Sequence, residues 1–197
     1  MKDNRYSLRA LALLLGYPDV ALRAQLPALM DVLDQEGSVP AARRAELRSL
    51  AADLSRRDPL EVEAQYVETF DRGRATSLHL FEHVHGDSRD RGPAMVDLAQ
   101  TYEKAGLRLS AEELPDHLCV VLEFASTQPP QLAQDFLGEM AHILTSIFSA
   151  LLKRSSPYAA AVAAVLELAG QRVQAVPFAA DEPLDESWAE PEAFDGC

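Results

Sequence analysis

The sequence predicts an all-α protein, a single helical-bundle domain of about eight to nine helices with no sheet. Apolar residues recur every three or four positions along most of the chain, beginning with Leu8, Leu11 and Leu15. No segment shows the convincing alternation of apolar and polar residues that indicates a half-buried strand. The 197 residues are enough to bury a sizeable core and lie within the usual range of one domain.

The first four helices have recognisable boundaries. Gly16-Tyr17-Pro18 ends the first helix, and Pro27 is expected to kink or restart the second, because proline lacks the backbone N–H and clashes with the preceding turn. A third helix begins near residues 38–40. Asp58-Pro59-Leu60-Glu61 then supplies an N-cap, a proline at the first helical position and an acid at the third. The arginines of the third helix are interpreted as a solvated face: Arg43, Arg44, Arg48 and Arg56.

The later helices follow the same logic. A short apolar helix is expected over residues 78–84, and the next helix stops at Gly106, which suits a left-handed C-terminal residue. A further helix opens after the linker at residues 113–117 and ends before Pro129. One long amphipathic segment then extends to Leu151, and a final Ala- and Val-rich helix runs from Ser156-Pro157 to about residue 173.

The net charge of −13 is unevenly distributed. Residues 1–57 hold nine Lys and Arg against seven Asp and Glu, whereas residues 58–197 hold nine against twenty-four. Such an acidic surface repels phosphate backbones and anionic membranes and attracts a cationic peptide. We therefore expect no nucleic-acid partner and no direct membrane insertion.

Residues 1–176 are expected to form the helical domain, and residues 177–197 an acidic, mostly disordered tail. The tail contains seven acids, three prolines and no Lys or Arg, a composition that buries too little apolar surface to offset chain ordering. Its role, and that of Trp188 within it, stays open. The start of the chain does not resemble a signal peptide, and Cys119 and Cys197 suggest no disulfide framework, so a reducing cytoplasm is the expected location.

Three histidines are the first candidates for chemistry. His79 and His83 would share one face of a helix, and imidazoles at that spacing can chelate a divalent metal if His85 turns to the same side. The pattern lacks the glutamate of the His-Glu-x-x-His zinc proteases, so no metal site is predicted. We expect the histidines to form hydrogen bonds within a polar groove.

No catalytic motif was found. Phosphate-binding glycine loops and the Gly-x-Ser-x-Gly nucleophile motif are absent from the sequence. Asp116-His117 reverses the order of the His-Asp pair of phosphohydrolases, and helix capping is its simplest structural role. Arg89 and Arg91 are expected to tie their loop through ion pairs with Asp87 and Asp90.

Several segments resemble one protein family. Residues 77–97 read SLHLFEHVHGDSRDRGPAMVD, and they closely resemble the NarJ-type, nitrate-reductase branch of the TorD-like redox-enzyme maturation chaperones. The resemblance extends to residues 14–18, to residues 66–70 and to residues 114–118, and covers most of residues 5–175. Thr69 stands where the wider superfamily has leucine, and Cys119 where nitrate-branch relatives often have proline.

The resemblance implies an all-helical assembly chaperone and not an enzyme. Such a protein binds the N-terminal region of the nitrate reductase catalytic subunit, prevents its premature membrane docking and assists insertion of the molybdenum cofactor. No cofactor would be bound stably, and proteins of molybdenum cofactor biosynthesis are possible further partners. A helical client peptide would place its apolar face in a groove while carboxylates pair with its cations.

The candidate residues for binding the client peptide fall into two groups. The expected apolar or aromatic wall consists of Tyr66, Phe70, Leu80, Phe81, His83, Tyr102 and Leu122. The expected polar rim consists of Glu82, Asp87, Asp116, His117 and Glu123. For the aromatic residues of the wall, packing in the core is the competing interpretation. Two other functions remain open: a generic acidic helical adaptor that uses its tail, and a metal-dependent enzyme built on His79, His83 and His85.

Overall fold

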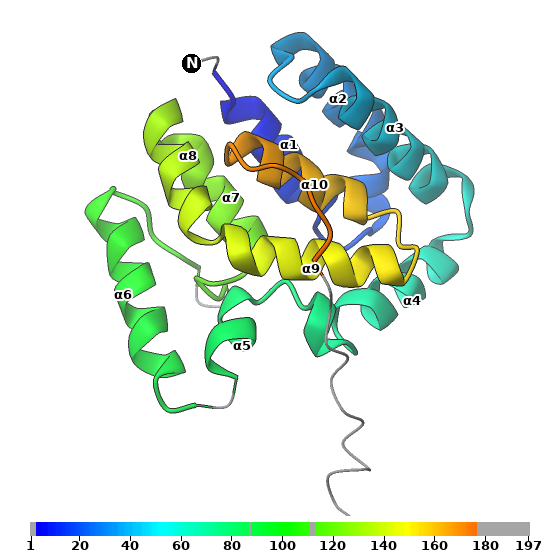
Figure 1. Ribbon diagram of the computed structural model, residues 1–197. Helices are drawn as coiled ribbons and strands as arrows, with labels where there is room; N and C mark the ends of the chain where they lie inside the picture. Colours follow the sequence, from blue (N-terminus) through cyan, green and yellow to red (C-terminus); the bar gives the residue numbers. More distant parts are fainter. Residues whose placement is uncertain (1–2, 87, 111–112, 177–197) are drawn as a thin grey trace, which may run out of the picture.

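The computed structural model describes residues 3–86, 88–110 and 113–176, and it confirms the all-helical fold (Figure 1). These residues form ten α-helices and one short 3-10 helix, and no strand. The predicted tail and Asp87 lie outside the described residues. The helices are α1 (Arg5–Leu14), α2 (Val20–Glu36), α3 (Ala41–Arg56), α4 (Pro59–Phe70), η1 (Arg74–Thr76), α5 (Leu80–His85), α6 (Arg91–Lys104), α7 (Leu118–Thr127), α8 (Pro130–Glu139), α9 (Ala141–Lys153) and α10 (Ala159–Leu168).

The core forms around α1, α7, α9 and α10. Helix α1 packs against α2, α7 and α10, and α10 packs in turn against α3, α8 and α9. Leu8 and Leu11 of α1 are fully buried, as are Val121 and Leu122 of α7. Nine of the ten residues of α10 are buried. Most of these are alanine or valine, whose small side chains allow neighbouring helices to approach closely.

The predicted helix starts and stops are largely confirmed. Asp58 is the N-cap of α4, and its carboxylate accepts hydrogen bonds from the backbone N–H groups of Leu60 (2.9 Å) and Glu61 (3.4 Å). Gly106 has a φ of +85°, a conformation that L side chains rarely adopt, as expected for a residue that follows a helix end. Pro27 neither breaks nor restarts α2, which is continuous. Its side chain is exposed, so the ring lies on the solvent side of the helix.

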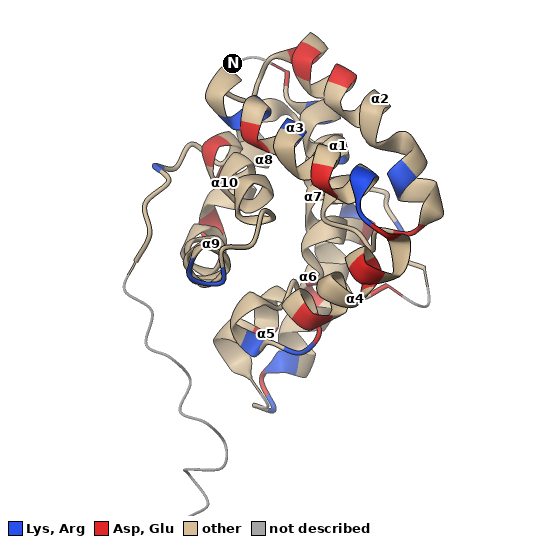
Figure 2. Ribbon diagram, turned by 90° about the vertical axis from the view of Figure 1, so that its right-hand side faces the viewer, with Lys and Arg blue, Asp and Glu red and all other residues tan. Residues whose placement is uncertain are grey.

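The interpretation of the α3 arginines as a solvated face is wrong for Arg43 and Arg44, which are only partly exposed, and holds for Arg48 and Arg56. Arg44 and Arg48 pair with Asp34 of α2 at 3.0 and 2.6 Å, and Arg43 pairs with Glu167 of α10 at 3.0 Å. Figure 2 shows acidic and basic segments interspersed over α2 and α3. The sequence could not reveal these pairs because their partners lie on other helices.

The long amphipathic segment after Pro129 is two helices, which raises the number above the expected eight to nine. Helices α8 and α9 meet at a bend of 67° near Met140, two residues after Gly138. Glycine has low helix propensity, and the bend lets α8 pack on α7 while α9 lies along α10. The last helix also ends earlier than expected, at Leu168, because Gly170 takes a φ of +72°.

Helices α5 and α6 form an arm at one edge of the molecule, at the left of Figure 1. Helix α6 packs mainly against α5, and of its fourteen residues only Leu98 and Tyr102 are buried. Tyr102 fastens the far end of the arm, since its hydroxyl donates a hydrogen bond to the Pro115 carbonyl at 2.8 Å. The arm thus depends on few apolar contacts.

No single helix of the described residues is both long and apolar enough to cross a membrane. The bent pair α8 and α9 meets that criterion only when its two helices are taken together.

Candidate functional site

Asp116 joins the start of α5 to the start of α7. Its backbone carbonyl accepts a hydrogen bond from the Leu80 N–H at 3.0 Å, and its carboxylate accepts one from the Phe81 N–H at 3.1 Å. The Leu118 N–H donates to the Leu78 carbonyl at 2.8 Å, which completes a short antiparallel pairing. Asp116 is fully buried, and these bonds replace water at its backbone carbonyl and at Oδ2, whereas no described residue forms a hydrogen bond with Oδ1.

Two basic side chains face the buried carboxylate of Asp116. His79 Nδ1 lies 3.5 Å from one carboxylate oxygen, and the Arg91 guanidinium lies 3.8 Å from the other. Burial acts to raise the pKa of Asp116, but His79, the Phe81 N–H and Arg91 outweigh it, and the pKa lies below its ordinary value. The contact with Asp116 raises the pKa of His79 despite the opposing effect of burial.

His117 is a helix cap next to this pair. Its Nδ1 accepts a hydrogen bond from the Cys119 N–H at 3.3 Å at the start of α7, so the expected capping role is confirmed for this residue. Its ring packs edge-on against that of His79 at a centroid distance of 4.9 Å. Burial, followed by repulsion from His79, lowers the pKa of His117. The pKa of His79 therefore lies above the ordinary value for histidine, and the pKa of His117 lies below it.

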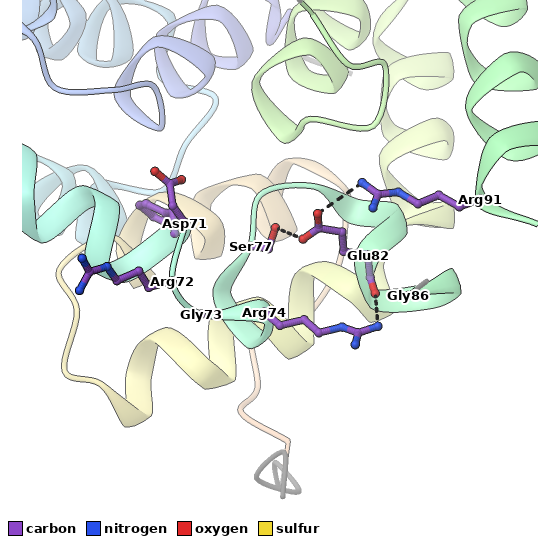
Figure 3. A pocket seen from close by; sticks show the side chains of 9 residues that line it. Asp71, Arg72, Gly73, Arg74, Ser77, Glu82, Gly86 and Arg91 are labelled. Atoms are coloured by element: carbon purple, nitrogen blue, oxygen red, sulfur yellow. Dashed lines mark hydrogen bonds and ion pairs between the residues drawn. The ribbon is translucent and has the colours of Figure 1, made fainter. Parts of the chain in front are cut away.

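A cleft of about 260 Å³ opens beside Asp116, and Figure 3 shows it. Glu82 stands at its centre. The Glu82 carboxylate accepts a hydrogen bond from the Ser77 hydroxyl at 2.7 Å and pairs with Arg91 at 3.3 Å, while its backbone carbonyl accepts one from Arg74 at 3.4 Å. We call this the Glu82 cleft; its lining is Phe70, Asp71, Arg72, Gly73, Arg74, Ser77, Glu82, Gly86 and Arg91.

Gly86 allows an arginine to lie against the end of α5. A Cβ at Gly86 would come within 2.1 Å of the Arg74 guanidinium, and the φ of this residue is +53°. Any other residue would therefore displace Arg74 and strain the backbone. The guanidinium reaches a carbonyl in the last turn of α5, where a cation is favoured by the helix dipole.

The structure divides the predicted client-binding residues among several places. The side chains of Tyr66, Phe70, Leu80, Tyr102 and Leu122 are buried at 6% exposure or less, so they pack behind the surface. The Phe81 N–H bonds to Asp116 and Arg91 contacts both Asp116 and Glu82, whereas His83 bonds to the Ser77 carbonyl; Phe70 is part of the lining of the cleft. Exposed Glu123 lines a different depression, between α7 and the end of α6, and Asp87 lies outside the described residues. Binding of a client by any of these residues stays a prediction.

The three histidines do not converge on a metal. The helix begins at Leu80, so His79 precedes it and does not share a face with His83. His79 faces Asp116, His83 Nε2 bonds the Ser77 carbonyl at 2.9 Å, and the His85 ring packs on Phe81. Within residues 3–86, 88–110 and 113–176, no group of three metal-binding side chains was found. The spacing argument failed because the short helix starts two residues later than expected.

Two arginines of the site, Arg74 and Arg91, have partners that the sequence did not predict. Arg91 pairs with Glu82 and Asp116, two partners that had not been expected; Asp87, one of the two loop acids expected to pair with it, lies outside the described residues. Arg74 was not singled out at all. The signal that could have identified it is its position three residues before Ser77, in a segment rich in glycine and charge.

The structure is that of an all-helical protein in which buried charges hold segments distant in sequence together. Comparison with known proteins identifies its group. The chain belongs to the nitrate reductase delta subunit family, whose model matches residues 36–164. The resemblance to NarJ-type chaperones is thereby confirmed.

Several relatives are similar over most of the chain. The Escherichia coli (strain K12) nitrate reductase molybdenum cofactor assembly chaperone NarJ is 43% identical over 92% of this chain and 77% of the relative. E. coli NarW, named for the same role, is 40% identical over 83% of this chain and 68% of the relative. These relatives are named as assembly chaperones and not as catalysts, in agreement with the prediction that this chain is not an enzyme. A crystal structure of a redox enzyme maturation protein from Archaeoglobus fulgidus supports the fold (TM-score 0.58, 23% identity, 85% of this chain and 94% of the other).

Proposed function

We propose that this protein is a dedicated assembly chaperone for a nitrate reductase. It binds the N-terminal region of the catalytic subunit, keeps that subunit from docking prematurely to its membrane partner, and assists insertion of the molybdenum cofactor. The observation that carries the proposal is the 43% identity over 92% of the chain to a protein named for this assembly role. The cofactor is cargo of the client in this proposal and is not held stably by the chaperone.

The arrangement of the arm and the core supports this role. A chaperone must receive a segment of another protein and release it, which requires a surface whose parts can separate at modest cost. Besides the buried side chains of Leu80, Leu98 and Tyr102, polar contacts with Asp116, Ser77 and Pro115 join the α5–α6 arm to the rest of the molecule. Such contacts can rearrange more readily than a close-packed apolar core.

Calorimetry with the purified full chain tests client recognition. The probe is a synthetic peptide from the N-terminus of the same organism's nitrate reductase catalytic subunit, and the control is a scrambled peptide of equal composition. We expect saturable binding of the native peptide that exceeds binding of the scramble by at least about tenfold, a difference of about 1.4 kcal/mol. Equal binding of the two peptides would reduce the interaction to nonspecific attraction by the acidic chain and would contradict the proposal.

Cofactor insertion needs a separate measurement. The catalytic subunit is produced with and without this chaperone, and the molybdenum content of the purified subunit is measured by mass spectrometry. We expect the molybdenum content to fall when the chaperone is absent. A truncation after Val176, which removes the acidic tail, separates the chaperone from the adaptor alternative: loss of peptide binding by truncation alone would favour the adaptor.

A further inference from the structure

The outward side of α4 carries an exposed apolar depression. Its volume is about 600 Å³, and it lies between α4 and the loop that joins α1 to α2. Leu60 is 75% exposed and Tyr17 is 47% exposed, whereas Val62 and Tyr66 on the opposite side of the same helix are buried. We call this surface the α4 face; its lining is Tyr17, Leu60, Glu63, Ala64, Gln65, Val67, Glu68 and Arg72.

The apolar wall of the α4 face is held rigidly. The Tyr17 ring packs edge-on against Tyr66 at a centroid distance of 5.5 Å, and its hydroxyl donates a hydrogen bond to Glu63 at 3.1 Å. The Tyr66 hydroxyl donates to the Leu15 carbonyl at 2.8 Å, and the Tyr66 ring continues the contact inward to Phe70. An exposed tyrosine fixed at both ends offers contact area to a partner with little loss of side-chain entropy.

The charges around this wall are mostly acidic and only partly compensated. Glu63 accepts a hydrogen bond from the Tyr17 hydroxyl. Glu68 pairs with Arg72 at 3.3 Å, and both of these side chains are well exposed. The pKa of Tyr17 is raised by desolvation and by three carboxylates. These carboxylates belong to Glu63, Asp71 and Asp19. In Figure 2, the ribbon is red, marking Asp and Glu, at positions on and beside α4.

The Glu82 cleft next to it has a different balance. Asp116 is buried and opposed by His79 and Arg91, and Glu82 is paired with Arg91. Three arginines line that cleft, and one of them, Arg72, also lines the α4 face. The acids Asp71 and Glu82 nearly balance the arginines of the Glu82 cleft, whereas the α4 face has two glutamates against one arginine, so cationic side chains would be attracted more strongly to the α4 face.

We infer that the α4 face is the docking surface for a cationic amphipathic helix, the N-terminal segment of the client. An apolar side chain of that helix enters the depression between Tyr17 and Leu60, and its Lys or Arg side chains pair with Glu63 and Glu68. The inference rests on the proposed function, because the client segment is the occupant. The cationic side chains of the client then contact the glutamates of α4 and not the polar rim around Asp116 that the sequence predicted.

The test compares two double variants of the full chain by calorimetry with the client peptide. Leu60→Ser with Glu63→Gln removes the exposed apolar group and the acid, and the glutamine can still accept the Tyr17 hydrogen bond. Leu132→Ser with Glu139→Gln is the matched control on α8, on the opposite side in Figure 1, where Leu132 is 56% exposed and Glu139 is also exposed. Thermal unfolding establishes that each variant folds as the unaltered protein does.

We expect the α4 variant to bind the peptide on the order of tenfold more weakly than the unaltered protein, and the α8 control to bind as the unaltered protein does. The affinity of the α4 variant should also depend less on salt, because it has lost one carboxylate. Hydrogen exchange should show peptide-dependent protection in α4 of the unaltered protein.

The outcomes separate the inference from the proposed function. If the unaltered protein binds the peptide but the α4 variant binds equally well, and protection appears only around residues 77–86, the inference is overturned and the proposed function stands. If the unaltered protein does not prefer the native peptide over its scramble, the proposed function fails and the occupant assigned to the α4 face fails with it.

Discussion

Helix α10 and the α5–α6 arm are stabilised in different ways. Helix α10 buries nine of its ten residues among α1, α3, α8 and α9, whereas α6 buries two of fourteen. The arm relies instead on hydrogen bonds and ion pairs that meet at Asp116 and Glu82. Apolar burial is nondirectional and does not titrate, while each polar contact depends on geometry and protonation. The arm should therefore respond to small chemical changes that leave the core intact.

The largest expected effect comes from the core. Leu166→Ala removes a fully buried side chain from α10, and the cavity it leaves should lower the free energy of unfolding by about 2–5 kcal/mol. Urea denaturation followed by circular dichroism measures the change. Leu132→Ala, at an exposed position of α8, is the control and should alter stability by less than about 0.5 kcal/mol. Equal effects of the two variants would contradict the assignment of α10 to the core.

A smaller and local effect is expected from Asp116→Asn. The substitution removes the charge that faces His79 and Arg91 but keeps an oxygen that can accept the Phe81 N–H. Arg91 is partly exposed and retains Glu82, so we expect a loss of about 1–3 kcal/mol and not the larger penalty of an isolated buried charge. Hydrogen exchange should accelerate in α5 and α6 and stay unchanged in α10. Uniform acceleration throughout the chain would mean that the arm and the core unfold as one unit.

The smallest expected effect concerns pH. The raised pKa of His79 adds stability that is complete below about pH 6.5, the unfolded value, and is lost as the pH rises through the folded value. The lowered pKa of His117 adds stability that is complete above about pH 6.5 and is lost as the pH falls through its folded value. This pair should therefore give a shallow maximum of stability near that pH.

Two variants separate these contributions. His79→Asn should flatten the alkaline side of the maximum, and His117→Asn, which can still cap α7, should flatten the acidic side. Denaturation at half-unit steps between about pH 5 and pH 8 measures both slopes. Unchanged slopes in both variants would show that neither histidine is coupled to folding.

The sequence by itself determined the fold class and most helix boundaries. Apolar spacing and caps are local properties, so Asp58 and Gly106 could be read directly, and residues 77–97 were enough to indicate the family. The sequence did not show how the segments meet. The bend near Met140, the pairing of Arg43 with Glu167, and the convergence of His79, Arg91 and Asp116 each join residues that are distant in sequence or depend on how neighbouring helices pack.

The candidate site also depends on contacts between residues that are distant in sequence. Residue type suggested an acidic rim around Asp116, but only the tertiary structure decided that this carboxylate is buried and faced by His79 and Arg91. Likewise, nothing in the sequence links Tyr17 to Glu63, and they form one surface only because α4 packs beside the loop that follows α1. Charge and burial act through distances in space, which the folded chain sets and the order of residues does not.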